Sequence, residues 1–232
     1  MGIQRRHFLQ TTGGLALAAL MRAQPVEAAE EGFCVPEDPL QALMAGNRRF
    51  AEAWQRADQE NKTTLRAANL DPRCFNSPMA LATSQHPWAT VLTCSDSRVS
   101  PSWGFDTTPG ELFVMRNAGN TAFTEAIASV EYGVSVLKTP LLMVMGHSGC
   151  GAVTAAMGTN PLTPSLDRLI QPIRENISGS SDLEEAVKRN ALASASTLVQ
   201  RSTVLADAKA SGALKLVVGC FQLNSGVVTL IE

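Results

Sequence analysis

The stretch LLMVMGHSGCGAVTAAM, residues 141–157, runs from an apolar segment through a short polar segment into a helical pattern. An unbroken apolar run such as Leu141–Met145 is typical of a strand buried on both faces of a parallel sheet. Ala152–Met157 then begins a helix, so the stretch predicts a strand–loop–helix unit. The loop, residues 147–151, holds a histidine and a cysteine three positions apart.

A second stretch, ATVLTCSDSR at residues 89–98, repeats the pattern of an apolar run followed by polar residues. Further predicted strands and helices alternate around both stretches: strands at 111–116, 214–218 and 227–231, and helices at 38–57, 122–137 and 182–200. Residues 160–181, which contain three prolines, are expected to form a connecting loop around a short helix. This alternation predicts an α/β fold, a mostly parallel four- to five-stranded sheet flanked by helices, with an N-terminal helical arm at about 38–57.

The composition is that of a folded domain, with 45% hydrophobic and 17% charged residues among 232. It excludes a disordered chain, which needs few hydrophobic and many charged residues. A net charge of −2 gives no basic footprint, so we expect no nucleic-acid partner. The five cysteines are odd in number and widely spread, which argues against a disulfide framework. A disulfide between Cys34 and Cys74 stays open as an alternative.

The first 28 residues read as a targeting segment. Arg5 and Arg6 precede an apolar run at 13–21, and residues 26–28 (VEA) fit the small-x-small cleavage pattern. The paired arginines resemble the twin-arginine export signal, so we expect a signal peptide over 1–28, a domain over 29–232 and a periplasmic or otherwise extracytoplasmic location. The alternative is an N-terminal anchor, but the apolar run is about half the ~20 residues that a spanning helix needs. We therefore expect no stable membrane insertion.

Two groups of polar residues follow the two buried strands. Cys94, Asp96 and Arg98 alternate after one strand, and in an extended backbone they would share one face. His147 and Cys150 follow the other strand, and the carboxyl ends of parallel strands border the ligand crevice of such folds. Cys94, His147 and Cys150 make a Cys₂His set of the kind that holds catalytic zinc, so we expect one zinc ion per chain. Taken singly, each has a simpler explanation, in core packing or a turn hydrogen bond.

Two signatures, CSDSRV at residues 94–99 and HSGCG at 147–151, resemble the paired motifs of the β-class carbonic anhydrases. The resemblance extends to Gln85-x-Pro87, to GELFVMRNAGN at 110–120 and to Ser129-x-Glu131-Tyr132, and it covers roughly residues 38–230. It implies a zinc enzyme that reversibly hydrates carbon dioxide to bicarbonate and a proton.

The resemblance also implies roles for individual residues. Cys94, His147 and Cys150 would bind the zinc. Asp96, held by Arg98, would accept a hydrogen bond from the zinc-bound hydroxide and orient it for attack, which makes these two the catalytic residues. The residues matching substrate-binding positions are Gln85, Phe113, Ala118, Tyr132 and Gly151. Of these, Gln85 and Phe113 would reach the site across the interface of a homodimer or homotetramer.

Alternatives stay open within and beyond this resemblance. The same fold could hydrolyse carbon disulfide or carbonyl sulfide, or serve as a catalytically silent, zinc-stabilised assembly protein. In some members the aspartate becomes a zinc ligand and closes the site, and those members carry tryptophan three residues before the first cysteine. Val91 stands there in this sequence, which favours the open form. His86 could shuttle protons, but a surface histidine is the simpler interpretation.

Overall fold

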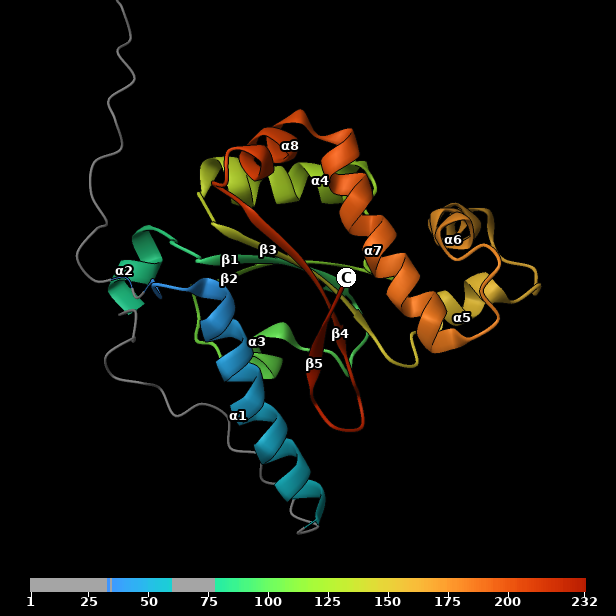
Figure 1. Cartoon of the computed structure of the whole chain (residues 1–232), viewed down its shortest axis with the longest axis horizontal. Helices are drawn as coiled ribbons and strands as arrows, with labels where there is room; N and C mark the ends of the chain where they lie inside the picture. Colours follow the sequence, from blue (N-terminus) through green and yellow to red (C-terminus); the bar gives the residue numbers. More distant parts are fainter. Residues whose placement is uncertain (1–32, 34, 60–77) are drawn as a thin grey trace, which may run out of the picture. The chain divides into compact units, whose positions relative to one another are not determined.

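The computed structural model describes residue 33 and residues 35–59 and 78–232. The predicted signal segment and the Cys34–Cys74 pair lie outside the described residues. Five strands form one sheet in the order β2-β1-β3-β4-β5 (Figure 1). Their bounds are β1 Ala89–Cys94, β2 Leu112–Asn117, β3 Leu141–His147, β4 Lys215–Phe221 and β5 Val228–Ile231. Strands β1 to β4 pair in parallel and β5 joins β4 antiparallel, so the predicted fold is confirmed.

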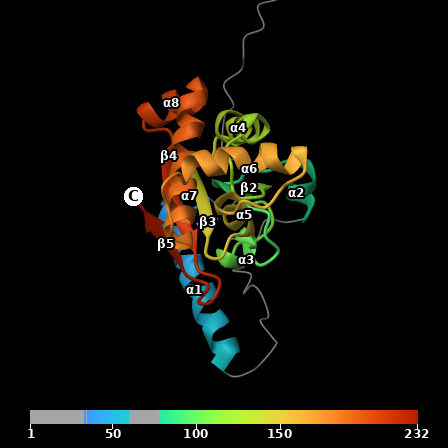
Figure 2. The same ribbon diagram turned by 90° about the vertical axis from the view of Figure 1, so that its right-hand side faces the viewer.

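Helices cover both faces of this sheet (Figures 1 and 2). Helices α4 (Thr124–Glu131), α7 (Leu183–Arg201) and α8 (Thr203–Ala210) pack on one face, against strand residues that include Leu92, Leu142 and Val144. Helix α1 (Pro39–Gln59) packs on the other face, where Leu43 lies in a core with Val91, Leu141 and Met143. Successive residues of β1 and β3 thus enter opposite cores, and both strands are buried along their whole length.

The helix predictions at 38–57 and 182–200 are confirmed, and side-chain caps explain where these helices begin. An Asp38 carboxylate oxygen accepts the Gln41 N–H at 3.0 Å at the start of α1. An Asp182 carboxylate oxygen accepts the Glu185 N–H at 2.8 Å at the start of α7. The helix predicted over 122–137 is α4 followed by a π-helical turn, η1 (Tyr132–Val136). No helix among the described residues is long and apolar enough to cross a membrane.

The predicted loop over 160–181 is shorter than expected, and the helix within it is longer. Pro164–Asn176 form a regular helix, α6, of 13 residues. Pro164 occupies the first turn, where a missing N–H is tolerated, and Thr163 accepts the Leu166 N–H at 3.3 Å. Pro172 lies inside the helix, but Ile170 and Ile173 beside it are buried in the core. That burial offsets the backbone hydrogen bond that an internal proline removes.

The order of the strands in the sheet determines where the predicted site lies. From β1 the chain runs outward to β2 on one side and then returns to β3 and β4 on the other. Such a reversal opens a crevice beyond the carboxyl ends of the two central strands. Strand β1 ends at Cys94 and β3 ends at His147, which leads through Cys150 into α5 (Gly151–Met157).

Gly46 marks the tightest helix contact, because a Cβ built there would lie 1.9 Å from the Phe105 carbonyl oxygen at the end of α3 (Pro101–Gly104). Gly46→Ala is expected to lower the free energy of unfolding by about 2 kcal/mol, although alanine improves helix propensity by about 1 kcal/mol. A backbone oxygen cannot rotate away as a side chain would. Urea unfolding followed by circular dichroism measures the change. Gly158→Ala is the control, since its Cβ would approach no atom closer than 3.6 Å. Equal losses in the two variants would contradict the packing argument.

Candidate functional site

The two half-sites predicted from the sequence meet at the carboxyl ends of β1 and β3. One ligand atom from each of Cys94, His147 and Cys150 lies within 4.8 Å of the others. The two sulfur atoms are 4.0 Å apart. All three residues are buried, with Cys94 5%, His147 0% and Cys150 1% exposed. The donors come from a strand end, a neighbouring strand end and the cap of α5.

The imidazole of His147 is fixed so that one nitrogen faces this group. Its Nδ1 lies 3.0 Å from the Ser148 carbonyl oxygen, and a carbonyl can only accept, so Nδ1 carries the hydrogen. The Nε2 atom is therefore a lone-pair donor, and it is buried without a hydrogen-bond partner among the residues that the structure describes. An orphaned imidazole nitrogen beside two thiols is the environment of a zinc ligand, so the residues present fit a zinc ion.

The two thiols share one hydrogen bond, which separates their acidities. That bond lowers the pKa of Cys94 and raises the pKa of Cys150, because one proton is held between two sulfur atoms. The Gly119 backbone N–H also donates to Cys94 Sγ, at 3.3 Å, and favours its thiolate. Cys150 is the N-cap residue of α5. A bound divalent cation would take both sulfurs as thiolates.

Asp96 and Arg98 form a bidentate pair beside the sulfurs. Arg98 Nε donates to Asp96 Oδ1 at 2.9 Å, and its terminal nitrogen donates to Oδ2 at 2.7 Å and to the Gly149 carbonyl at 3.1 Å. These hydrogen bonds hold the pKa of Asp96 well below its usual range. Oδ2 lies 3.8 Å from His147 Nε2, so the ionised carboxylate borders the ligand group. Both of its oxygens accept hydrogen bonds from Arg98.

The prediction that Cys94, Asp96 and Arg98 share one face of an extended backbone is wrong. The chain after Cys94 is not extended, so an alternating face does not explain why Asp96 and Arg98 meet. It turns instead, with the Val99 N–H donating to the Asp96 carbonyl at 3.0 Å. The Arg98 backbone N–H donates to Asp96 Oδ1 at 2.9 Å, which closes a local turn around the carboxylate.

Arg116 is a supporting residue that the sequence analysis passed over. Its guanidinium donates to three carbonyl groups of the loop after β1: to Cys94 at 3.1 Å, to Asp96 at 2.8 Å and to Val99 at 2.7 Å. The loop that carries both a metal donor and the carboxylate is thus fixed by one side chain from the neighbouring strand. An arginine at the end of a predicted strand, inside the quoted 110–120 stretch, was the available signal.

The five predicted substrate residues fall into two places. Ala118 precedes Gly119 beside Cys94, and Gly151 follows Cys150, so both adjoin the ligand group. Phe113 and Tyr132 contact each other, with ring centroids 5.9 Å apart, at the outer edge of the sheet. Phe113 lies four positions before Asn117, the partner of Cys94 in the sheet register, which is about 13 Å along the strand. Gln85 is exposed before β1. The single chain does not bring Gln85, Phe113 and Tyr132 to the ligand group.

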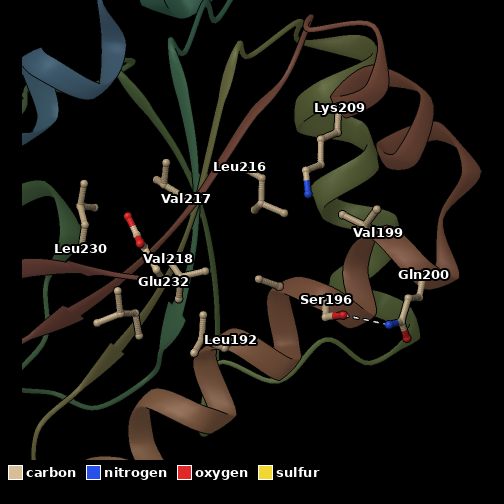
Figure 3. Close-up of a pocket in the computed structure, with 12 residues that line it drawn as sticks. Leu192, Ser196, Val199, Gln200, Lys209, Leu216, Val217, Val218, Leu230 and Glu232 are labelled. Carbon is tan, nitrogen blue, oxygen red and sulfur yellow. Dashed lines mark hydrogen bonds between the residues drawn. The ribbon is translucent and has the colours of Figure 1, made fainter.

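A separate hollow of about 520 Å³ lies elsewhere on the domain, between α7, α8 and the strands β4 and β5 (Figure 3). Its lining is largely apolar, with Leu192, Leu216 and Leu230 among its residues and Lys209 as a cationic group. None of the predicted site residues lines it.

Comparisons with known proteins agree with this geometry. The family model described as carbonic anhydrase matches residues 89–228. Carbonic anhydrase 2 of Mycobacterium tuberculosis is 31% identical over 195 residues, covering 79% of this chain and 94% of the relative. A carbonic anhydrase of Pseudomonas aeruginosa is 34% identical over 174 residues, covering 66% and 77%.

Solved structures give the same result at the level of the fold. A Coccomyxa β-carbonic anhydrase in complex with acetazolamide superposes with a TM-score of 0.61 at 27% identity, over 84% of this chain and 87% of that one. The β-carbonic anhydrase CafA of Aspergillus fumigatus gives 0.59 at 27% identity, over 84% and 91%. By sequence, by fold and by its group of potential zinc ligands, this chain belongs to the β-class carbonic anhydrase family.

Proposed function

We propose that this chain catalyses the reversible hydration of carbon dioxide to bicarbonate and a proton, with one zinc ion held by Cys94, His147 and Cys150. The observation that carries this proposal is the buried Cys₂His group lying beside an intact Asp96–Arg98 pair. When bound, zinc supplies the Lewis acidity that lowers the pKa of water to about 7 and so provides a nucleophile at neutral pH.

The role of Asp96 follows from its own hydrogen bonds. An ionised carboxylate can only accept, and Arg98 already donates two hydrogen bonds to Oδ1, from its backbone N–H and its Nε, and one to Oδ2. The remaining lone pair of Oδ2, on the side of His147, can accept a hydrogen from the attacking water and fix the direction of its oxygen lone pair. Because the Asp96 carboxylate is stabilised by Arg98, it is a weak base, so we assign it orientation rather than proton removal. Arg98 holds Asp96 and ties it to Gly149.

We further propose that the Gly151 backbone N–H and Ala118 face the substrate in the same chain, and that Gln85, Phe113 and Tyr132 belong to a substrate pocket completed in a homodimer or homotetramer. The positions of these residues support this. Gln85 and Tyr132 are exposed, and Phe113 lies on β2, an edge strand of the sheet. Carbon dioxide offers little to hydrogen-bond, so the paired rings of Phe113 and Tyr132 would give it an apolar surface.

Asp96→Asn tests the orienting role. Its amide matches the carboxylate in size but loses the charge and donates where the carboxylate accepted, so kcat/KM for carbon dioxide hydration should fall about 10²-fold or more with zinc content unchanged. Stopped-flow hydration assays between pH 7 and 9 measure this.

Asp167→Asn is the matched control, because Asp167 also pairs with an arginine, at 2.6 Å, on α6 away from the site. It should keep wild-type activity. A fully zinc-loaded wild type without carbon dioxide hydration would defeat the proposed function, and hydrolysis of carbon disulfide or carbonyl sulfide would then be assayed on the same sample.

Cys94→Ser and Cys150→Ser should each lose zinc, since a hydroxyl does not replace a thiolate ligand at neutral pH. Plasma mass spectrometry of the purified protein should find about one zinc per chain in the wild type and well under half of that in either variant. Cys220→Ser is the control: Cys220 is buried in the same core, where burial raises the pKa of its thiol, but it is not in the ligand group. Zinc loss from Cys220→Ser alone would contradict the assignment.

We propose that residues 1–28 direct export by the twin-arginine route, on the support of Arg5 and Arg6 and the apolar run after them. Arg5→Lys with Arg6→Lys preserves the charge and removes the paired guanidinium groups. In cells that express the full chain, the double variant should stay in the cytoplasm while the wild type reaches the periplasm. Fractionation and immunoblotting measure the distribution, and equal export of both chains would contradict the assignment.

A further inference from the structure

One ligand sulfur is held by a part of the chain outside the two signatures. Cys94 Sγ accepts the Gly119 backbone N–H at 3.3 Å. Gly119 has a positive φ of 81°, and a Cβ there would lie 2.5 Å from Ile173 Cδ1 and 3.2 Å from the Ala152 Cβ. The turn is therefore pressed against α5 and α6 with no room for a side chain. Because glycine is the most flexible residue, the direction of this N–H depends on what holds the turn in place.

Asn190, on the buried face of α7, provides that hold. Its side-chain amide donates to the Gly119 carbonyl oxygen at 2.7 Å, across 71 positions of sequence. Its own oxygen accepts the Asn176 side-chain amide at 3.0 Å, from the last residue of α6. Asn190 has no exposed surface. With both ends of its amide engaged, its orientation is fixed, and it anchors the Gly119 carbonyl from a rigid helix.

We propose that Asn190 is a positioning residue for the metal centre, acting through Gly119 on the Cys94 sulfur; this rests on the proposed zinc function. Held by Asn190, the Gly119 turn keeps its N–H directed at Sγ. A hydrogen bond to a thiolate withdraws charge from the sulfur and fixes the direction of its remaining lone pairs. Removal of the hydrogen-bond partners of metal ligands typically lowers metal affinity by about 10- to 100-fold.

A second buried polar residue of α7 has no hydrogen bond to Gly119. Ser194 lies one turn further along α7, is equally buried and has a hydroxyl with no hydrogen-bond partner among the described residues. Ser194 therefore shares the helix and the burial of Asn190 without a link to Gly119. It provides a matched control for the general effect of altering a buried polar side chain on this helix.

The test compares Asn190→Ala and Asn190→Asp with Ser194→Ala in the full chain. Zinc affinity is measured by competition with a chelator, and the sulfur-to-metal charge-transfer absorption is measured after cobalt(II) substitution. Both Asn190 variants should bind zinc about 10- to 100-fold more weakly and shift the charge-transfer band, since both lose the donor to Gly119. Ser194→Ala should keep the wild-type affinity and spectrum.

An Asn190→Ala protein with unchanged zinc affinity and an unchanged spectrum overturns the proposal, whatever happens to its stability. If both Asn190 variants fail to fold, Asn176→Ala decides. That change removes only the outer hydrogen bond that orients the Asn190 amide, so a smaller band shift in the folded variant supports the proposal and no shift overturns it.

Neither readout uses carbon dioxide. A wild type that binds zinc tightly but does not hydrate carbon dioxide would defeat the proposed function and leave this proposal standing. If the wild type is fully active but the Asn190 variants keep its zinc affinity and cobalt(II) spectrum, the proposed function stands and this proposal is overturned.

Discussion

The parallel pairing of β1 with β3 is the constraint on which the site depends. Its register sets Thr93 opposite Met145, so the two strands reach the same edge of the sheet together. A slip of one residue would turn the sulfur of Cys94 to the opposite face from its partners. The register is held by buried apolar residues such as Leu92 and Val144, because each must stay in its own core. The hydrophobic effect thus helps to bring Cys94 close to His147 and Cys150, which lie 53 and 56 positions later in the sequence.

At this edge of the sheet, arginine side chains and a backbone N–H donate hydrogen bonds to a cluster of electron-rich atoms and to the loop that carries them. Two sulfurs, an imidazole nitrogen and a carboxylate lie close together, and an unpaired Asp96 would compete for a metal. Arg98 engages both carboxylate oxygens, and Arg116 holds the backbone that carries them. Two arginines therefore hold Asp96 and its loop in this arrangement.

The sequence was sufficient to predict what depends on local pattern. Unbroken apolar runs marked β1 and β3, and the helices predicted at 38–57 and 182–200 lie close to the bounds of α1 and α7. It failed where tertiary packing overrides the local signal, as in α6, where Pro172 is tolerated because its neighbours are buried. The ligand set could be named from residue types, but Arg116 and Asn190 act through contacts 17 to 71 positions away. In the sequence, the contact of Asn190 with Gly119 is indicated only by an asparagine among the apolar and small residues on the buried face of α7.

The 4.0 Å between the two ligand sulfurs has a redox consequence. A disulfide needs about 2.05 Å between its sulfurs, so a two-electron oxidant that removed both thiol hydrogens would join the empty pair only after the sulfurs had moved about 2 Å closer. Zinc bound to both sulfurs withholds them from that reaction. The ligand group brings together residues from β1, β3 and the start of α5, so it is complete only when these elements are assembled. In an oxidising compartment, the order in which the folded chain meets metal and oxidant then decides between a working centre and a covalently closed one.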